Sequence, residues 1–163
     1  MADFGKREAS YQPTPAVLRV AESYVVPLKL AMRRTQGIQL ASITFDSFDR
    51  QAPEGVRGFS AGPRQLMYQF GDFFIDMRLE PKPSSNMAVL TGQIVDSRQP
   101  TAGVAEVPVS LISGAGTLLE TTTNQQGEFH FSFRSADHLM LLAEIKDSAL
   151  LMLLPPGGGG EAA

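Results

Sequence analysis

The sequence predicts a mainly β protein: an antiparallel β-sandwich with a β-hairpin extension and an N-terminal helix. The first observation is that apolar and polar residues alternate with a period of two from residue 38 onward. The second is that turn-forming residues interrupt these runs roughly every 8 to 12 residues, a spacing typical of sandwiches. The third is that residues 90–133 hold four strand-like runs and three turn signals, a density that favours strands over helices.

Composition indicates one globular domain. The chain has 163 residues, of which 43% are hydrophobic and 19% charged, so it can bury one core and is not disordered overall. It contains no cysteine, which excludes disulfides and thiolate metal sites. The net charge of −3, without a concentrated basic surface, argues against nucleic acid as a partner. We expect no cofactor, and nothing in the sequence indicates a small-molecule ligand.

The sequence shows no recognisable export or membrane signal, which favours a cytoplasmic location. The N-terminal run MADFGKREASYQPTPA has neither the apolar core nor the small-residue cleavage site of a signal peptide. No apolar run reaches the roughly 18 to 20 residues that a membrane-spanning helix requires. We therefore expect a soluble, cytoplasmic protein with no membrane span.

The N-terminal region is predicted to comprise a flexible lead over residues 1–14 and an amphipathic helix over residues 15–36. Pro27 favours an end or a kink of this helix near Val26. Residues 1–37 carry a net charge of +3 and the remainder −6, which favours attraction between the two parts only weakly, because salt screens exposed charges over roughly 8 Å. The helix could dock on the chain's own sandwich, on a second copy or on a partner, and the sequence leaves these alternatives open. Apolar residues at spacings of three and four form its stripe: Val17, Val20, Ala21, Tyr24, Val25 and Leu28.

Residues 37–82 are predicted to form a β-hairpin extension packed on the sandwich. Apolar and polar residues alternate over 73–80, as expected for a half-buried antiparallel strand. Residues 65–70 alternate as well, and Gly71-Asp72 between the two runs predicts a tight turn. Residues 38–45 have strand propensity with poorer alternation, and we predict one strand there.

Residues 83–155 are predicted to form the sandwich, and residues 156–163 a disordered tail. With about seven strands in the sandwich, the chain would have roughly nine in all. Within residues 83–155 the sequence indicates six strand-like runs, at residues 87–96, 107–112, 117–123, 128–133, 138–146 and 149–154.

Asn124 and Gly127 are predicted to close a hairpin in the middle of this region. The Asn124 side chain can accept a bond from the backbone two residues on, and Gly127 can adopt the positive φ that the turn needs. After the turn, Phe129, Phe131 and Phe133 share one face of a strand. A buried Phe contributes roughly 2 to 3 kcal/mol, so this strand should be a principal part of the core.

Three motifs of this region resemble a known family. They are GQIVD at 92–96, VPVSL at 107–111 and TTTNQQGEFHF at 121–131. Together they are similar to the carboxypeptidase regulatory-like domain, a transthyretin-like or prealbumin-like β-sandwich, over about 65 residues. Asn124 stands where that family usually has Asp, which keeps the turn but removes a carboxylate that could bind calcium. The closing strand lacks the family's aromatic-rich ending. The resemblance implies a fold and says little about a ligand.

A second resemblance covers residues 43–79. The order TFDSF, GVRG and PRQLMYQFGDFFIDMRLEP, followed by the sandwich, is similar to small bacterial proteins that accompany extracytoplasmic-function sigma factors and their anti-sigma partners. It implies a non-enzymatic regulatory or accessory role.

Titratable residues form no convincing catalytic or metal constellation. His130 and His138 would bind a metal only if they converged with a carboxylate such as Asp137 or Glu128, and surface histidines are favoured. No nucleophile-elbow motif is present in the sequence. The charged residues of the run 76–80 fit a solvated strand face with cross-strand ion pairs better than an acid and base pair. We therefore predict no catalytic, cofactor-binding or metal-binding residues.

These observations favour a non-enzymatic protein-binding module that acts in accessory or assembly roles, with a protein partner or self-association. One alternative is a carbohydrate-binding or surface module, which the absence of Trp and the presence of only three Tyr disfavour. Another is a transthyretin-like hydrolase, for which the two histidines lack a partner motif. The candidate partner-binding residues belong to the N-terminal stripe or are expected to be exposed on second strand faces: Val17, Val20, Tyr24, Leu28, Met67, Phe74, Met140 and Leu142.

Overall fold

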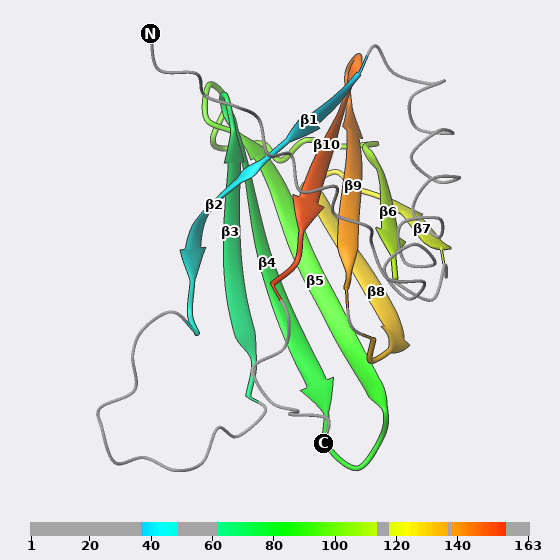
Figure 1. Cartoon of the computed structure of the whole chain (residues 1–163). Coiled ribbons are helices and arrows are strands. Elements are labelled where there is room, and N and C mark those ends of the chain that lie inside the picture. The colour runs from blue at the N-terminus through cyan, green and yellow to red at the C-terminus, as the bar shows by residue number, and fades with distance from the viewer. Residues whose placement is uncertain (1–36, 49–61, 114–117, 137, 156–163) are drawn as a thin grey trace, which may run out of the picture.

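The computed structural model describes residues 37–48, 62–113, 118–136 and 138–155, and over these ranges the protein is mainly β (Figure 1). The predicted lead, N-terminal helix and tail lie outside the described residues. No helix within the described ranges is long and apolar enough to cross a membrane. The described strands are β1 (Ile38–Leu40), β2 (Ser42–Asp46), β3 (Arg64–Phe70), β4 (Phe73–Lys82), β5 (Met87–Asp96), β6 (Pro108–Ile112), β7 (Leu118–Thr122), β8 (Glu128–Arg134), β9 (Met140–Ile145) and β10 (Ser148–Leu153).

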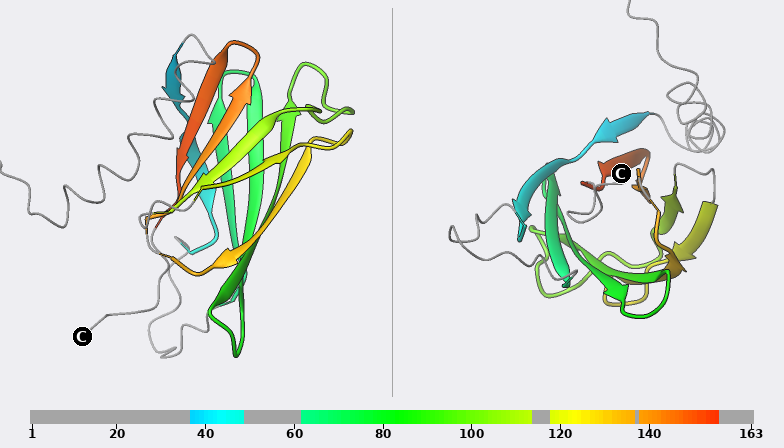
Figure 2. Two further views of the ribbon diagram at one scale, coloured as in Figure 1. Left: turned by 90° about the vertical axis from the view of Figure 1, so that its right-hand side faces the viewer. Right: turned by 60° about the horizontal axis from the view of Figure 1, so that its bottom comes forward.

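The strands form two five-stranded sheets. Sheet A has the order β1-β10-β9-β6-β7, and sheet B the order β2-β3-β4-β5-β8. Viewed along the strands, the two sheets curve around a common interior (Figure 2). The pairings are antiparallel apart from that of β1 with β10, which is parallel. The fold is therefore antiparallel, as predicted for the sandwich, with one parallel pairing at this edge.

One apolar face of each sheet lines the core. Leu141 of sheet A and Leu90 of sheet B are fully buried in the same hydrophobic cluster, so the two sheets pack face to face. Strand β8 contributes Phe129, Phe131 and Phe133 to this cluster, and all three side chains are buried. The alternation that the sequence indicates for β8 is confirmed: its intervening residues are exposed.

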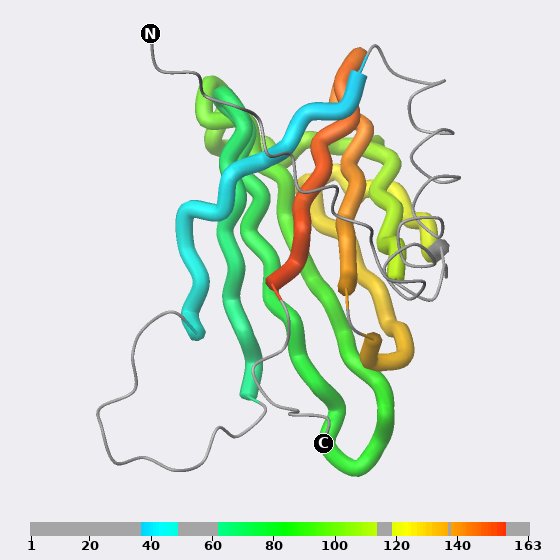
Figure 3. Tube along the Cα trace, in the orientation of Figure 1, coloured from blue at the N-terminus to red at the C-terminus, as the bar shows by residue number. Residues whose placement is uncertain are grey.

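The predicted single strand over residues 38–45 is divided between the two sheets. The Ala41 N–H donates to the carbonyl oxygen of Leu151 in sheet A at 3.0 Å, whereas Ile43 pairs with Tyr68 in sheet B. Residues 38–46, here called the crossing segment, thus form the outermost strand of both sheets on one side of the molecule (Figure 3). This division is why the described residues hold ten strands where the sequence predicts nine.

The hairpin expected around Gly71-Asp72 is confirmed. Phe70 pairs with Phe73, and Gly71 adopts a φ of +55° in the two-residue turn between them. Strands β3 and β4 lie inside sheet B, paired with β2 on one side and β5 on the other. The residues predicted to form an extension therefore supply interior strands of the same sheet as β5 and β8.

The turn at Asn124 and Gly127 has the predicted chemistry but a different role. Asn124 Oδ1 accepts bonds from the Gln126 and Glu128 N–H groups at 3.0 and 2.9 Å, and Gly127 has a φ of +77°. Instead of closing a hairpin, it joins β7 of sheet A to β8 of sheet B. The Gly127 carbonyl oxygen accepts the Ile94 N–H at 2.9 Å, which directs the chain onto β5. The predicted hairpin is therefore a connection between sheets.

Candidate functional site

Exposed apolar side chains lie on the crossing segment and at the end of the neighbouring strand β10. Leu40, Ile43 and Leu153 are 61%, 45% and 56% exposed and are the large exposed hydrophobic residues of the described ranges. Leu40 pairs with Leu151 on the outer face of sheet A, so Leu153, two residues further along β10, is its diagonal neighbour. We call these three residues the seam patch.

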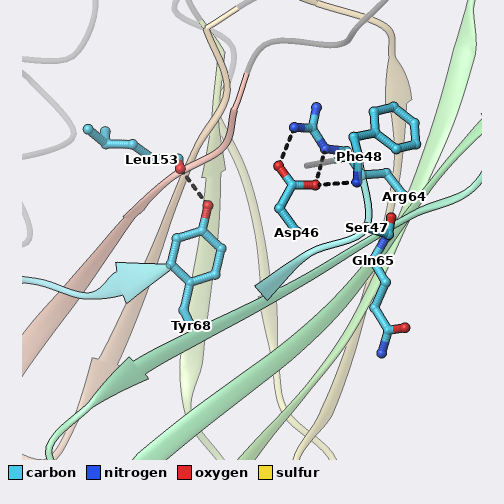
Figure 4. A network of polar contacts seen from close by, with 7 residues as sticks. All are labelled: Asp46, Ser47, Phe48, Arg64, Gln65, Tyr68 and Leu153. Carbon is cyan, nitrogen blue, oxygen red and sulfur yellow. Dashed lines mark hydrogen bonds and ion pairs between the residues drawn. The ribbon is translucent and has the colours of Figure 1, made fainter. Parts of the chain in front are cut away.

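A hydrogen bond between the two sheets supports the seam patch. The buried Tyr68 side chain of β3 donates its hydroxyl to the carbonyl oxygen of Leu153 in β10 at 2.5 Å (Figure 4). Because Ile43 pairs with Tyr68, this bond connects the two ends of the patch. Burial raises the pKa of Tyr68 to about 12, so the phenol is protonated at neutral pH and remains a donor.

A buried ion pair holds the far end of the crossing segment. Arg64 donates from Nε to Asp46 Oδ1 at 2.9 Å and from Nη2 to Oδ2 at 2.5 Å, the bidentate geometry typical of strong pairs (Figure 4). The Phe48 N–H donates to the same carboxylate at 3.0 Å, and its ring lies 4.6 Å from the guanidinium carbon. Both charged side chains are buried. The hydrogen bonds from Arg64 hold the pKa of Asp46 below its usual value, against the opposing effect of burial.

The crossing segment presents an exposed strand edge. β1 and β2 are the last strands of their sheets, and Gln39, Leu40, Ser42, Ile43 and Thr44 are all exposed. An edge strand offers unpaired backbone donors and acceptors to an incoming strand. A β-bulge between Ile43 and Phe45 limits the regular part of this edge to its first residues. Geometrically, the segment suits the addition of a short extended peptide.

The structure places the predicted partner-binding residues in different environments. Val17, Val20, Tyr24 and Leu28 lie outside the described residues. Met67 and Phe74 are half-buried on the outer face of sheet B.

The expected exposure of Met140 and Leu142 is wrong. Their side chains are only 4% and 3% exposed, although both lie on the outer face of sheet A. Leu142 packs with Ala149, Ile38 and Leu151 on that face.

The outer face of sheet B forms a second candidate surface, which is polar. It is a shallow concavity of about 960 Å³ with Gln65, Asp76, Thr91 and Gln93 among its lining residues. Gln65 donates from Nε2 to Asp76 Oδ1 at 3.1 Å and to Oδ2 at 3.4 Å, and the Asp76 side chain is exposed. The face is solvated, as expected from its sequence.

The charged side chains on sheet B pair differently from the prediction. Arg78 pairs with Glu80 along the same strand, Nη2 to Oε1 at 2.7 Å, rather than with a neighbouring strand.

The two histidines are surface residues. His130 and His138 are exposed, and Glu128 accepts a bond from the Asn124 side chain at 2.9 Å. Asp137 lies outside the described residues. In the ranges that the structure describes, no three His, Cys, Asp or Glu residues come together in a group that could hold a metal ion.

Comparison with known proteins adds no relative: no protein-family model, no curated protein and no solved structure matches this chain.

Proposed function

We propose that this chain is a non-enzymatic protein-binding module that receives an extended segment of its partner along the crossing segment. The observation that carries the proposal is the seam patch beside an exposed strand edge. In strand addition, backbone hydrogen bonds supply affinity, and contacts with alternate side chains supply specificity. Leu40 and Leu153 offer apolar contacts on the outer face of sheet A, and Ile43 offers them at the opening between the sheets.

The supporting contacts favour binding because they fix the edge before the partner arrives. Arg64 and Asp46 hold one end of the crossing segment, and the Ala41 N–H bond to Leu151 holds its middle. A pre-organised edge loses less conformational entropy on binding than a loose one does. The bidentate pair and the Tyr68 hydroxyl bond therefore act as positioning contacts in this proposal.

The two family resemblances indicate which partners to test first. The resemblance to carboxypeptidase regulatory-like sandwiches fits a binding role. The resemblance to bacterial proteins found beside sigma and anti-sigma factors makes those proteins the first partners to test. A cytoplasmic location would place the chain in the same compartment as a sigma factor.

Site-specific photo-cross-linking in the native host tests the proposal. A photoreactive residue replaces Ser42 on the exposed edge, and a matched control replaces Thr91, an exposed residue on the interior strand β5. We expect a discrete protein adduct at Ser42 and none at Thr91. Ile43→Lys should reduce the adduct about tenfold, the loss that corresponds to about 1.4 kcal/mol of binding free energy.

Two results would contradict the proposal: equal adducts at the two positions, or an adduct at Ser42 that Ile43→Lys does not change. An adduct between two copies of this chain would identify the donor of the strand as a second copy.

The polar concavity of sheet B favours saccharide binding as a second candidate function. Amide, hydroxyl and carboxylate groups of Gln65, Thr91 and Asp76 line it, and such groups hydrogen-bond to sugar hydroxyls. If this candidate holds, the protein binds a defined neutral saccharide on a glycan array, and Asp76→Ala abolishes the signal. Glu120→Gln, on the exposed surface of sheet A, should leave it unchanged. If Asp76→Ala left saccharide binding unchanged, the outer face of sheet B would be excluded as the saccharide-binding site.

A further inference from the structure

The middle of the outer face of sheet A is buried, although a two-sheet fold leaves such a face open. Ile112 and Ala149 have no exposed surface, and Met140 and Leu142 are almost fully covered. The register pairs Met140 with Ile112 and Leu142 with Ser110, so these residues form one continuous surface. Their sequence neighbour Leu141 belongs to the main core and therefore points to the opposite side.

The described strands cannot account for this burial. Sheet B packs on the inner face of sheet A, where Val109, Leu141 and Leu150 enter the shared cluster. On the outer face, Leu142 and Ala149 instead form a separate small cluster, against which Ile38 and Leu151 pack. Because large apolar side chains reach zero exposure only when atoms pack on them, this face needs a third layer.

We infer that residues 15–36 of the same chain form this third layer, with their apolar stripe on the outer face of sheet A. The occupant is identified first by position. The Gly37 carbonyl oxygen accepts the Ala149 N–H at 3.0 Å, so the chain enters β1 directly beside the buried surface. A segment that ends at residue 36 therefore needs no linker to reach it.

Length and composition agree with the same occupant. A helix of about 20 residues is roughly 30 Å long, enough to cross five strands spaced about 4.8 Å apart. The stripe residues Val17, Val20, Tyr24 and Leu28 supply an apolar side to match the apolar face. The net charge of +3 on residues 1–37 complements the −6 of the remainder.

This assignment changes which surface is available to a partner. Docked residues 15–36 use their stripe within the chain, so Val20 and Tyr24 are core contacts and not partner contacts. The seam patch lies outside the docked layer, since Leu40 and Leu153 are more than half exposed. The inference does not depend on the proposed protein-binding function and can hold without it.

The absence of cysteine makes the inference testable by cross-linking in the full-length chain. Ser110→Cys places a thiol on the outer face of sheet A, opposite Leu142. It is combined in turn with Val20→Cys and with Tyr24→Cys, and the monomer isolated by size exclusion is treated with a short bis-maleimide. We expect an intrachain cross-link in at least one pair. Thr91→Cys, on the outer face of sheet B, replaces Ser110→Cys as the control and should give none.

A second measurement covers the case in which linker geometry prevents the cross-link. The maleimide labelling rate of the single variant Ser110→Cys should rise about tenfold when Tyr24→Asp is added, because a buried charge expels the segment. Tyr11→Asp, in the predicted lead, should leave the rate unchanged. Cross-links only between chains would show that a second copy covers the face. No intrachain cross-link together with no change in labelling rate would overturn the inference.

Discussion

Phe131→Ala is expected to lower the free energy of unfolding by about 3 to 5 kcal/mol. Phe131 lies in the middle of β8, is 4% exposed, and pairs with the fully buried Leu90 of β5. Its ring belongs to the cluster shared by both sheets and lies 6.2 Å from the Phe129 ring, centroid to centroid. Truncation removes buried apolar surface and leaves a cavity that neighbouring strands can fill only in part. Urea denaturation followed by circular dichroism measures the loss.

The adjacent residue provides the control for this variant. Ser132 is exposed on the opposite face of β8, so Ser132→Ala should change the unfolding free energy by less than about 0.5 kcal/mol. A loss below about 1 kcal/mol for Phe131→Ala would contradict the placement of this ring in a packed core.

Arg64→Met is expected to cost about 3 to 5 kcal/mol at neutral pH, because it leaves the Asp46 carboxylate buried without its bidentate partner. The loss should depend on pH. In the native protein Arg64 lowers the pKa of Asp46, so this stabilisation is present above the unfolded pKa of about 3.9. It disappears as the pH falls through the folded pKa. In the variant, the Phe48 N–H bond to Asp46 remains, but the bonds from Arg64 no longer oppose burial, which favours the neutral form of the carboxyl. The difference between the two proteins should therefore be largest near pH 7 and shrink below about pH 4.

A second bidentate pair supplies the matched control. Arg98 and Asp96 are joined through Nη2 and Oδ2 at 2.7 Å, but the Arg98 side chain is half exposed. Solvent screens this pair, so Arg98→Met should cost much less stability at pH 7 than Arg64→Met does. Urea denaturation of the native protein and both variants at pH 7 and near pH 3.5 measures the loss in unfolding free energy. Equal losses in the two variants, or a loss for Arg64→Met that is independent of pH, would contradict the role assigned to the buried pair.

Features that depend on residues close together in the sequence were predicted correctly. The face of β8 and the turn at Gly71 follow from alternation and from the φ that glycine tolerates, and both are confirmed. Features that depend on the partner of a strand were predicted wrongly. Alternation does not distinguish a turn that joins two sheets from a hairpin, so the loop at Gly127 was misassigned. Ala41 fits a continuous strand equally well, although the chain changes sheets there.

The candidate site was harder to predict than the fold. Asp46 and Arg64 lie 18 positions apart, and no local pattern connects them. Met140 and Leu142 were expected to be exposed because alternation gives each strand of a two-sheet fold an outer face. It does not show whether another part of the chain covers that face. The seam patch follows from the change of sheet at Ala41, which the sequence did not indicate.

The parallel pairing of β1 with β10 has a consequence for the order of folding. These are the first and the last strands that the structure describes, and each is an immediate neighbour of the other in sheet A. During translation, β1 leaves the ribosome long before its partner has been made. A nascent chain can pair β3, β4 and β5 through short connections, whereas closure of sheet A must wait for β10. Contacts so distant in sequence make folding slow, and they make this closure a late event in it.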